Sequence, residues 1–167
     1  KIMEMNWLII FIAALVPLVI GFVWYNPKVF GNAWMAGSGM TEESMKGNNM
    51  TLVMILSFVF SFMLAIIMHP IAIHQFGLFS LLENQPGMHD NPITNPDWNA
   101  LMPKYADNFR TFKHGVLHGV IAALFFFLPT YGTMALYERR GFKYIAINVG
   151  YWAVSLGIMG GLISQFK

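Results

Sequence analysis

The chain has 167 residues, of which 56% are hydrophobic and only 11% are charged. Soluble domains usually carry about a quarter charged residues, so this composition excludes an ordinary soluble globule and favours a membrane protein of one domain. The formal net charge of +2, without any basic run, argues against nucleic acid as a partner. The sequence has no cysteine, which excludes disulfides, thiolate metal sites and cysteine nucleophiles.

Four apolar stretches are long enough to cross roughly 30 Å of hydrocarbon as helices. They are residues 7–25, 50–73, 115–137 and 144–166. The sequence therefore predicts an all-α, polytopic membrane protein with one domain over residues 1–167. We expect its four transmembrane helices to form an antiparallel bundle, with the lipid bilayer as its surroundings.

The first span ends in aromatic residues instead of a small-residue cleavage site, and it is too long for a signal peptide. Trp24, Tyr25 and Trp34 are predicted to anchor this end of the helix in the headgroup zone, where amphipathic rings gather. Asn26 and Pro27 end the helix and begin a short surface segment. A ligand groove formed by the same rings is the alternative interpretation.

One long polar connection, residues 75–113, joins the second and third spans. Its apolar part, residues 76–82, is too short to cross a bilayer and is predicted to lie at the interface. Asn95 followed by Pro96 predicts a short helix that continues to Met102, because asparagine caps helices and proline suits their first position.

Small residues recur at helical spacing along the last span and on part of the third. In lipid, helices gain nothing by hiding apolar side chains, and small residues stabilise a pair by letting two backbones approach closely. The glycines that we predict to pack helices are Gly119, Gly150, Gly157, Gly160 and Gly161. Because several helices carry such faces, we also expect self-association or contact with other membrane subunits.

The orientation follows from the shortest loop, which contains Arg139, Arg140 and Lys143 close to the membrane. Positive charge in short loops marks the cytoplasmic side. The termini and the long connection are therefore predicted to lie outside.

Four of the five histidines are predicted to lie at one membrane face: His69, His74, His114 and His118. His114 and His118 are four residues apart, so both imidazoles project from one side of a helix and can hold a divalent metal such as zinc. His69 completes the predicted set, with His74 and Asp90 as alternatives for the third ligand. Hydrogen bonding of these rings to loop carbonyls is the competing structural interpretation.

The predicted spans contain no Asp, Glu, Lys or Arg, whereas transporters and membrane hydrolases usually place such groups near mid-membrane. No catalytic residue is therefore assigned. We expect a non-enzymatic membrane protein, either a self-associating scaffold or an accessory subunit of a membrane complex. A small transporter or sensor that uses the histidines for a metal ion or a proton is the alternative.

Five motifs distinguish this sequence from other apolar chains: Gly21-Phe-Val-Trp-Tyr-Asn-Pro-Lys-Val-Phe-Gly-Asn-Ala-Trp-Met35, Met40-Thr-Glu42, His114-Gly-Val-Leu-His-Gly119, Leu136-Tyr-Glu-Arg-Arg140 and Ile147-Asn-Val-Gly-Tyr-Trp152. Together they resemble a bacterial family of small integral membrane proteins, domain-of-unknown-function family seventeen-sixty-one. The resemblance implies four helices in a bacterial inner membrane and brings no established activity.

Overall fold

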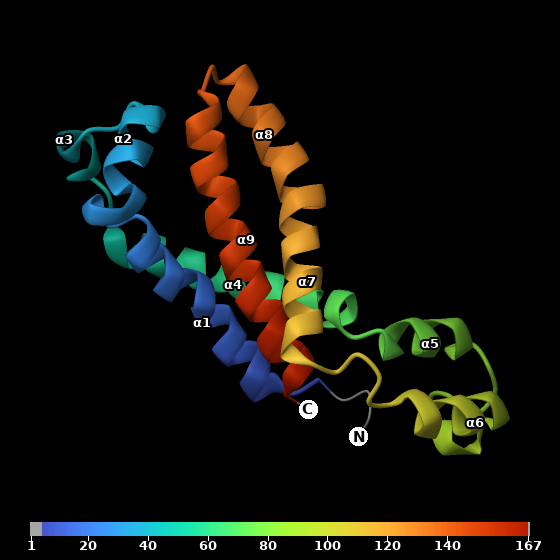
Figure 1. Ribbon diagram of the computed structural model, residues 1–167. Coiled ribbons are helices and arrows are strands. Elements are labelled where there is room, and N and C mark those ends of the chain that lie inside the picture. The colour runs from blue at the N-terminus through green and yellow to red at the C-terminus, as the bar shows by residue number, and fades with distance from the viewer. Residues whose placement is uncertain (1–4, 167) are drawn as a thin grey trace.

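The computed structural model describes residues 5–166, and every regular element within them is helical, as the sequence predicts (Figure 1). Among the described residues, four helical spans are long and apolar enough to cross a membrane. They are α1 (Trp7–Trp24), α4 (Met50–Ala72), the continuous segment of α7 (Phe112–Ala122), η3 (Ala123–Phe127) and α8 (Leu128–Tyr137), and α9 (Phe142–Gln165). These spans are those expected of an integral membrane protein.

The third span begins earlier than predicted, at Phe112, because the side chain of Thr111 caps it by accepting a hydrogen bond from the backbone N–H of His114. Its middle turn, η3, is π-helical and ends at Phe127, two residues before Pro129. Proline has no N–H for the i→i−4 ladder, so the helix absorbs the missing bond by widening locally.

Short helices connect the first two spans at one end of the molecule and the second and third spans at the other. The first group is η1 (Pro27–Gly31), α2 (Asn32–Ser38) and α3 (Glu42–Met45), and the second is α5 (Gln75–Leu82), η2 (Pro92–Thr94) and α6 (Pro96–Tyr105). Residues 75–105 thus form a helical hairpin within the connection predicted over residues 75–113. The predicted helix at Pro96 is confirmed: the Asn95 side chain accepts from the backbone N–H groups of Asp97 and Trp98.

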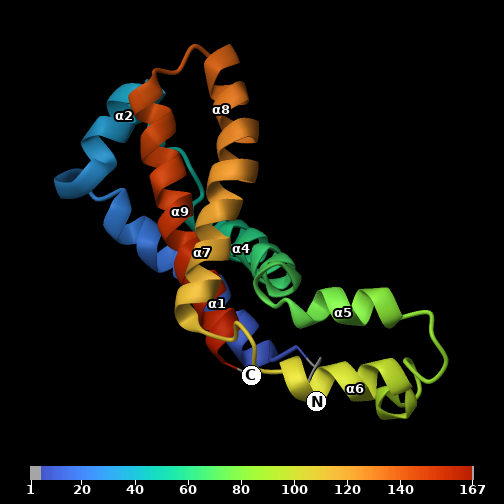
Figure 2. The same cartoon turned by 45° about the vertical axis from the view of Figure 1, so that its right-hand side comes forward.

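The long helices form two pairs, α1 with α4 and α7–α8 with α9, and the helices of each pair run in opposite directions (Figures 1 and 2). The pairs cross near the chain termini. From there α4 diverges from α8 (Figure 1), whereas α1 stays against α9 as far as Trp24. Small residues explain where they meet. Ala13, Ala65 and Ala122 lie in the core at this crossing, together with Met159.

The five glycines predicted to pack helices each have a protein neighbour. Their placements are Gly119 against the Leu156 and Gly157 backbone, Gly160 against the Gly115 carbonyl, Gly161 against the Phe112 ring, Gly157 against Val116 and Val120, and Gly150 against the Trp24 ring. Four of them therefore serve the contact between α7 and α9, and Gly150 serves the contact between α1 and α9.

The aromatic end of α1 docks on α9. The Trp24 indole N–H donates to the Ile147 carbonyl at 3.1 Å, and the Tyr25 hydroxyl donates to the Asn148 side-chain oxygen at 2.9 Å. The Trp34 ring meets Tyr25 edge-on with centroids 5.6 Å apart. The residues predicted as headgroup anchors therefore also join two helices.

Replacing Tyr25 with phenylalanine is expected to lower the stability of the fold by about 1 kcal/mol, because the Asn148 oxygen loses its donor. The measurement is reversible unfolding in mixed micelles as the fraction of denaturing detergent rises. Tyr137→Phe is the matched control, since that ring is 87% exposed. Equal stabilities for the two variants would contradict the role assigned to the Tyr25 hydroxyl.

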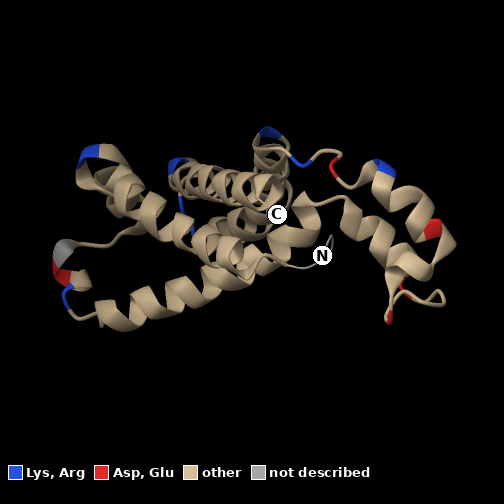
Figure 3. Cartoon of the chain, turned by 90° about the horizontal axis from the view of Figure 1, so that it is seen from below, with Lys and Arg blue, Asp and Glu red and all other residues tan. Residues whose placement is uncertain are grey.

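Charged residues lie at the extremities of the molecule, while the long helices are almost free of them (Figure 3). Arg139, Arg140 and Lys143 lie at the turn between α8 and α9, where Arg140 donates to the Ser38 carbonyl and so ties this turn to α2. The opposite end has the α5–α6 hairpin and the histidines described next.

Candidate metal centre

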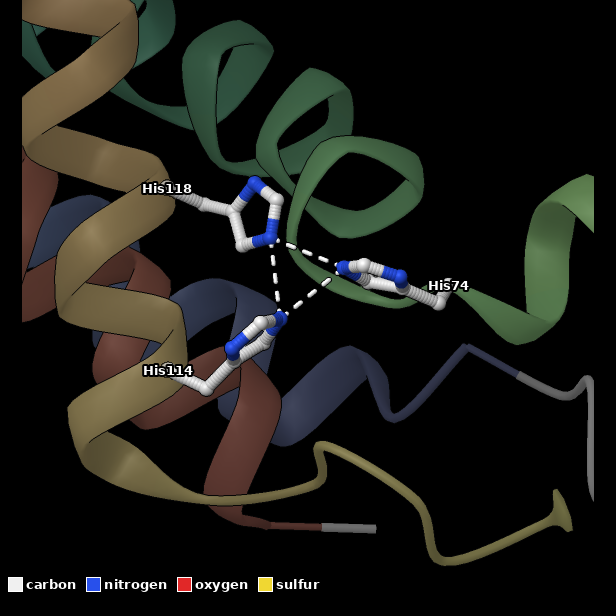
Figure 4. Close-up of side chains that lie close together, drawn as sticks. All are labelled: His74, His114 and His118. Atoms are coloured by element: carbon white, nitrogen blue, oxygen red, sulfur yellow. Dashed lines mark hydrogen bonds between the residues drawn. The ribbon is translucent and has the colours of Figure 1, made fainter.

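Three imidazole rings converge where α4 ends and α7 begins. The Nε2 atoms of His74 and His118 are 2.9 Å apart, those of His74 and His114 are 2.9 Å apart, and those of His114 and His118 are 3.0 Å apart (Figure 4). His74 is exposed and the other two rings are half-buried. We call these three residues the histidine cluster.

The convergence of the histidine cluster is difficult to explain by hydrogen bonds alone. Each Nε2 has either one proton or one lone pair, directed outward from its ring, so one nitrogen cannot form two good hydrogen bonds. Three pairwise bonds around a triangle therefore cannot all form. A single cation among the nitrogens satisfies all three lone pairs, with the ring protons on the Nδ1 atoms.

The spacing suits a small transition-metal ion. Nitrogens bound to one tetrahedral zinc ion at about 2.0–2.1 Å lie roughly 3.3–3.4 Å from one another. Binding would therefore spread the cluster by roughly 0.4 Å, a shift that the exposed His74 ring can accommodate. Three imidazoles leave a coordination position for water or another ligand, which is the arrangement of zinc sites that react or exchange ligands.

Local structure places two members of the cluster on the first two turns of α7. His114 and His118 are one turn apart on the same side of the helix, and their ring centroids are 4.6 Å apart. Between them, Gly115 packs directly against the Gly160 backbone of α9, which fixes the helix while leaving the imidazole side open. The sequence spacing predicts this pair.

His74 reaches the pair from the connection between α4 and α5. The side chain of the next residue, Gln75, is buried, and its amide nitrogen donates to the Tyr105 carbonyl at 2.7 Å and the Asn108 carbonyl at 2.9 Å. These bonds tie the start of α5 to the end of the α5–α6 hairpin. The hairpin thereby holds His74 beside α7, 40 residues along the chain from His114.

Phe109 closes one side of the cluster. Its ring stacks on His74 with centroids 5.2 Å apart and lies 4.9 Å from the His114 ring. The backbone of Phe109 has a φ of +63°, a left-handed conformation that costs a non-glycine residue roughly 1 kcal/mol or more. Neighbouring bonds hold it: Arg110 Nε donates to the Ser164 carbonyl, and the Ser164 hydroxyl donates to the Phe109 carbonyl.

His69, the third ligand in our prediction, lies outside the histidine cluster. It is buried within α4, with 7% of its surface exposed, and its ring meets Phe76 edge-on at 5.0 Å. The end of α4 explains the difference. His69 lies inside this helix and its side chain is buried, whereas His74 follows the last residue of the helix and its side chain lies beside α7. Asp90 is also absent from the cluster, which among the described residues contains only histidines.

Sequence reasoning did not identify Phe109 or Gln75. Neither belongs to a recognisable motif, and a positive φ at phenylalanine has no sequence signal. Their roles depend on the return of the α5–α6 hairpin to α7, which is a property of the tertiary fold.

The fold and the histidine cluster define a class: a small, all-helical protein with four helices able to span a membrane and three convergent imidazoles at one end. Within that class, the chain belongs to the family described as "Protein of unknown function (DUF1761)", whose model matches residues 8–164. The resemblance noted in the sequence is thus confirmed. Comparisons with curated proteins and with solved structures found no match.

Proposed function

We propose that this protein is a membrane-embedded metal protein that holds a divalent transition-metal ion, with zinc as the best fit, at the histidine cluster. The observation that supports this proposal is the meeting of three Nε2 atoms within 3.0 Å of one another. Three neutral nitrogens at this spacing need a shared electrophile, and imidazole is a preferred ligand of zinc and its neighbours.

The ion is proposed to be resident and not a transported cargo. Within the four spans, the charged side chains Lys113 and Lys143 lie only at helix ends. A hydrated ion leaving the cluster along the spans would meet hydrocarbon with no charged partner, which is strongly unfavourable. Sensing or ligand exchange at one membrane face fits this arrangement better than passage across the membrane.

The membrane is proposed to be a bacterial inner membrane, with the termini and the cluster on its outer side. The basic turn of Arg139, Arg140 and Lys143 at the opposite end supports this orientation. Self-association as a scaffold or accessory subunit stays a prediction. The glycines that motivated it pack against neighbours within the same chain, so they do not provide a surface for a second copy.

Metal analysis of the purified protein tests the proposal. After equilibration with zinc in detergent and removal of excess ion, we expect about one zinc per chain by elemental analysis, as for a three-histidine site. The double variant His114→Ala/His118→Ala is expected to retain less than about a tenth of that amount, because one imidazole cannot hold the ion in place.

His89→Ala is the matched control, since this exposed histidine lies in the α5–α6 hairpin at the same end of the molecule but outside the cluster. It should bind zinc as the unmodified chain does. A wild-type protein that binds no zinc, or a double variant that binds as much as the control, rules out the proposed function.

A further inference from the structure

An apolar groove of about 760 Å³ runs between α4 and the α7–η3–α8 span. On α4 it extends from Phe60 to Ile71, and on the opposite side from Ala122 to Thr130. The helical rise makes its length along α4 roughly 16 Å.

The lining of the groove is almost entirely apolar. Two of its side chains have polar atoms: Trp152 of α9 has an indole N–H, and the hydroxyl of Thr130 donates to the Phe126 and Phe127 carbonyls of its own helix. A polar ligand would lose its bonds to water and regain few of them, so the matching occupant is a hydrocarbon chain.

The size of the groove argues against a helix from a second copy. A helix with side chains is about 10–12 Å wide, so a length of 16 Å would occupy roughly 1,200 Å³ or more. The groove, at about 760 Å³, has less than two thirds of that volume. A single flexible chain fits where a helix cannot enter fully.

One end of the groove lies one helical turn from the histidine cluster. Ile71 precedes His74 by three residues, and Ala122 follows His118 by four on the same side of α7. Figure 4 shows the His118 and His74 rings beside the last turns of α4. The apolar groove and the histidine cluster therefore lie next to each other along α4 and α7.

We propose that the groove and the histidine cluster form one binding site for a single-chain amphiphile with a metal-ligating head, of the long-chain carboxylate class. The inference rests on the proposed metal centre. The carboxylate takes the coordination position that the three imidazoles leave open, and the chain lies between α4 and α7. A hydrocarbon chain that is already in lipid gains no hydrophobic free energy in the groove. The bond from the carboxylate to the metal therefore supplies the affinity, and the groove limits binding to chains that fit it.

Cobalt-loaded protein in detergent provides the test, because the visible spectrum of Co²⁺ reports a change of ligand directly. Palmitate has both the carboxylate and the long hydrocarbon chain, and acetate has the carboxylate without the chain. Ile67→Trp fills the groove from a half-exposed position, and Ile55→Trp adds the same ring to a similarly exposed position of α4 outside the lining.

We expect palmitate to shift the cobalt spectrum of the unmodified chain and of Ile55→Trp at the same concentration. Ile67→Trp should need about tenfold more palmitate, while acetate should act equally on all three proteins. A cobalt spectrum that palmitate leaves unchanged, or an Ile67→Trp variant that responds as the control does, overturns the inference while the metal centre stands. Failure of the protein to bind cobalt is a different outcome, which would contradict both the proposed metal centre and this inference.

Discussion

Replacing Gly119 with alanine is expected to lower the free energy of unfolding by about 3 kcal/mol, at the upper end of the usual effect of overpacking. A Cβ at this position would lie well inside contact distance of the Leu156 carbonyl and 2.6 Å from the Gly157 nitrogen. Both are backbone atoms of α9, which cannot rotate aside as a side chain can. The two helices would have to separate, and the dispersion contacts along their interface would weaken.

Gly157→Ala is the matched control, because it adds the same methyl group to the same interface from the other helix. Its Cβ would lie 3.5 Å from Val120 and 3.6 Å from Val116, which is ordinary contact, and alanine favours the helix by up to about 1 kcal/mol. Unfolding in mixed micelles, followed by tryptophan fluorescence, should therefore show one destabilised variant and one of normal or raised stability. Similar curves for both would mean that α7 and α9 do not pack with Gly119 at the contact.

The features that the sequence predicts well are those whose cause is local. The cap at Asn95 and Pro96 needs only neighbouring residues, so it was predicted at the correct position. The same holds for the pairing of His114 with His118, which follows from helical spacing. Small-residue spacing accounts for only part of the packing of α9: Gly157 and Gly160 are buried, but so are the bulky residues Met159 and Ile163.

The features that the sequence could not predict depend on distant segments. The spacing of Gly119 does not reveal that its neighbour is the Leu156 backbone. The choice between His69 and His74 is the clearest example. Both histidines lie near the end of the same span, and only the position of α7 and the anchoring of Gln75 decide which imidazole joins the cluster.

Replacing His74 or His69 with alanine, one at a time, is expected to have opposite effects: the first lowers zinc affinity and the second lowers stability. His74→Ala removes one of three converging nitrogens, so the zinc affinity should fall by more than about 100-fold, beyond the roughly 10–100-fold cost of losing an outer-shell partner. Because the His74 ring is exposed, its removal should leave the stability of the metal-free protein nearly unchanged.

His69→Ala should show the opposite pattern. Its ring is 7% exposed and packs against Phe76, so truncation leaves a cavity in α4 and lowers stability by about 2 kcal/mol. Its Nδ1 atom has no hydrogen-bond partner among the described residues, and the ring lies outside the cluster, so zinc affinity should stay within about twofold of the unmodified value. Competition titration against a zinc indicator, with unfolding of the metal-free protein in parallel, measures both quantities. A loss of zinc affinity in His69→Ala, with affinity retained in His74→Ala, would restore the ligand set expected from the sequence and contradict the one that the structure assembles.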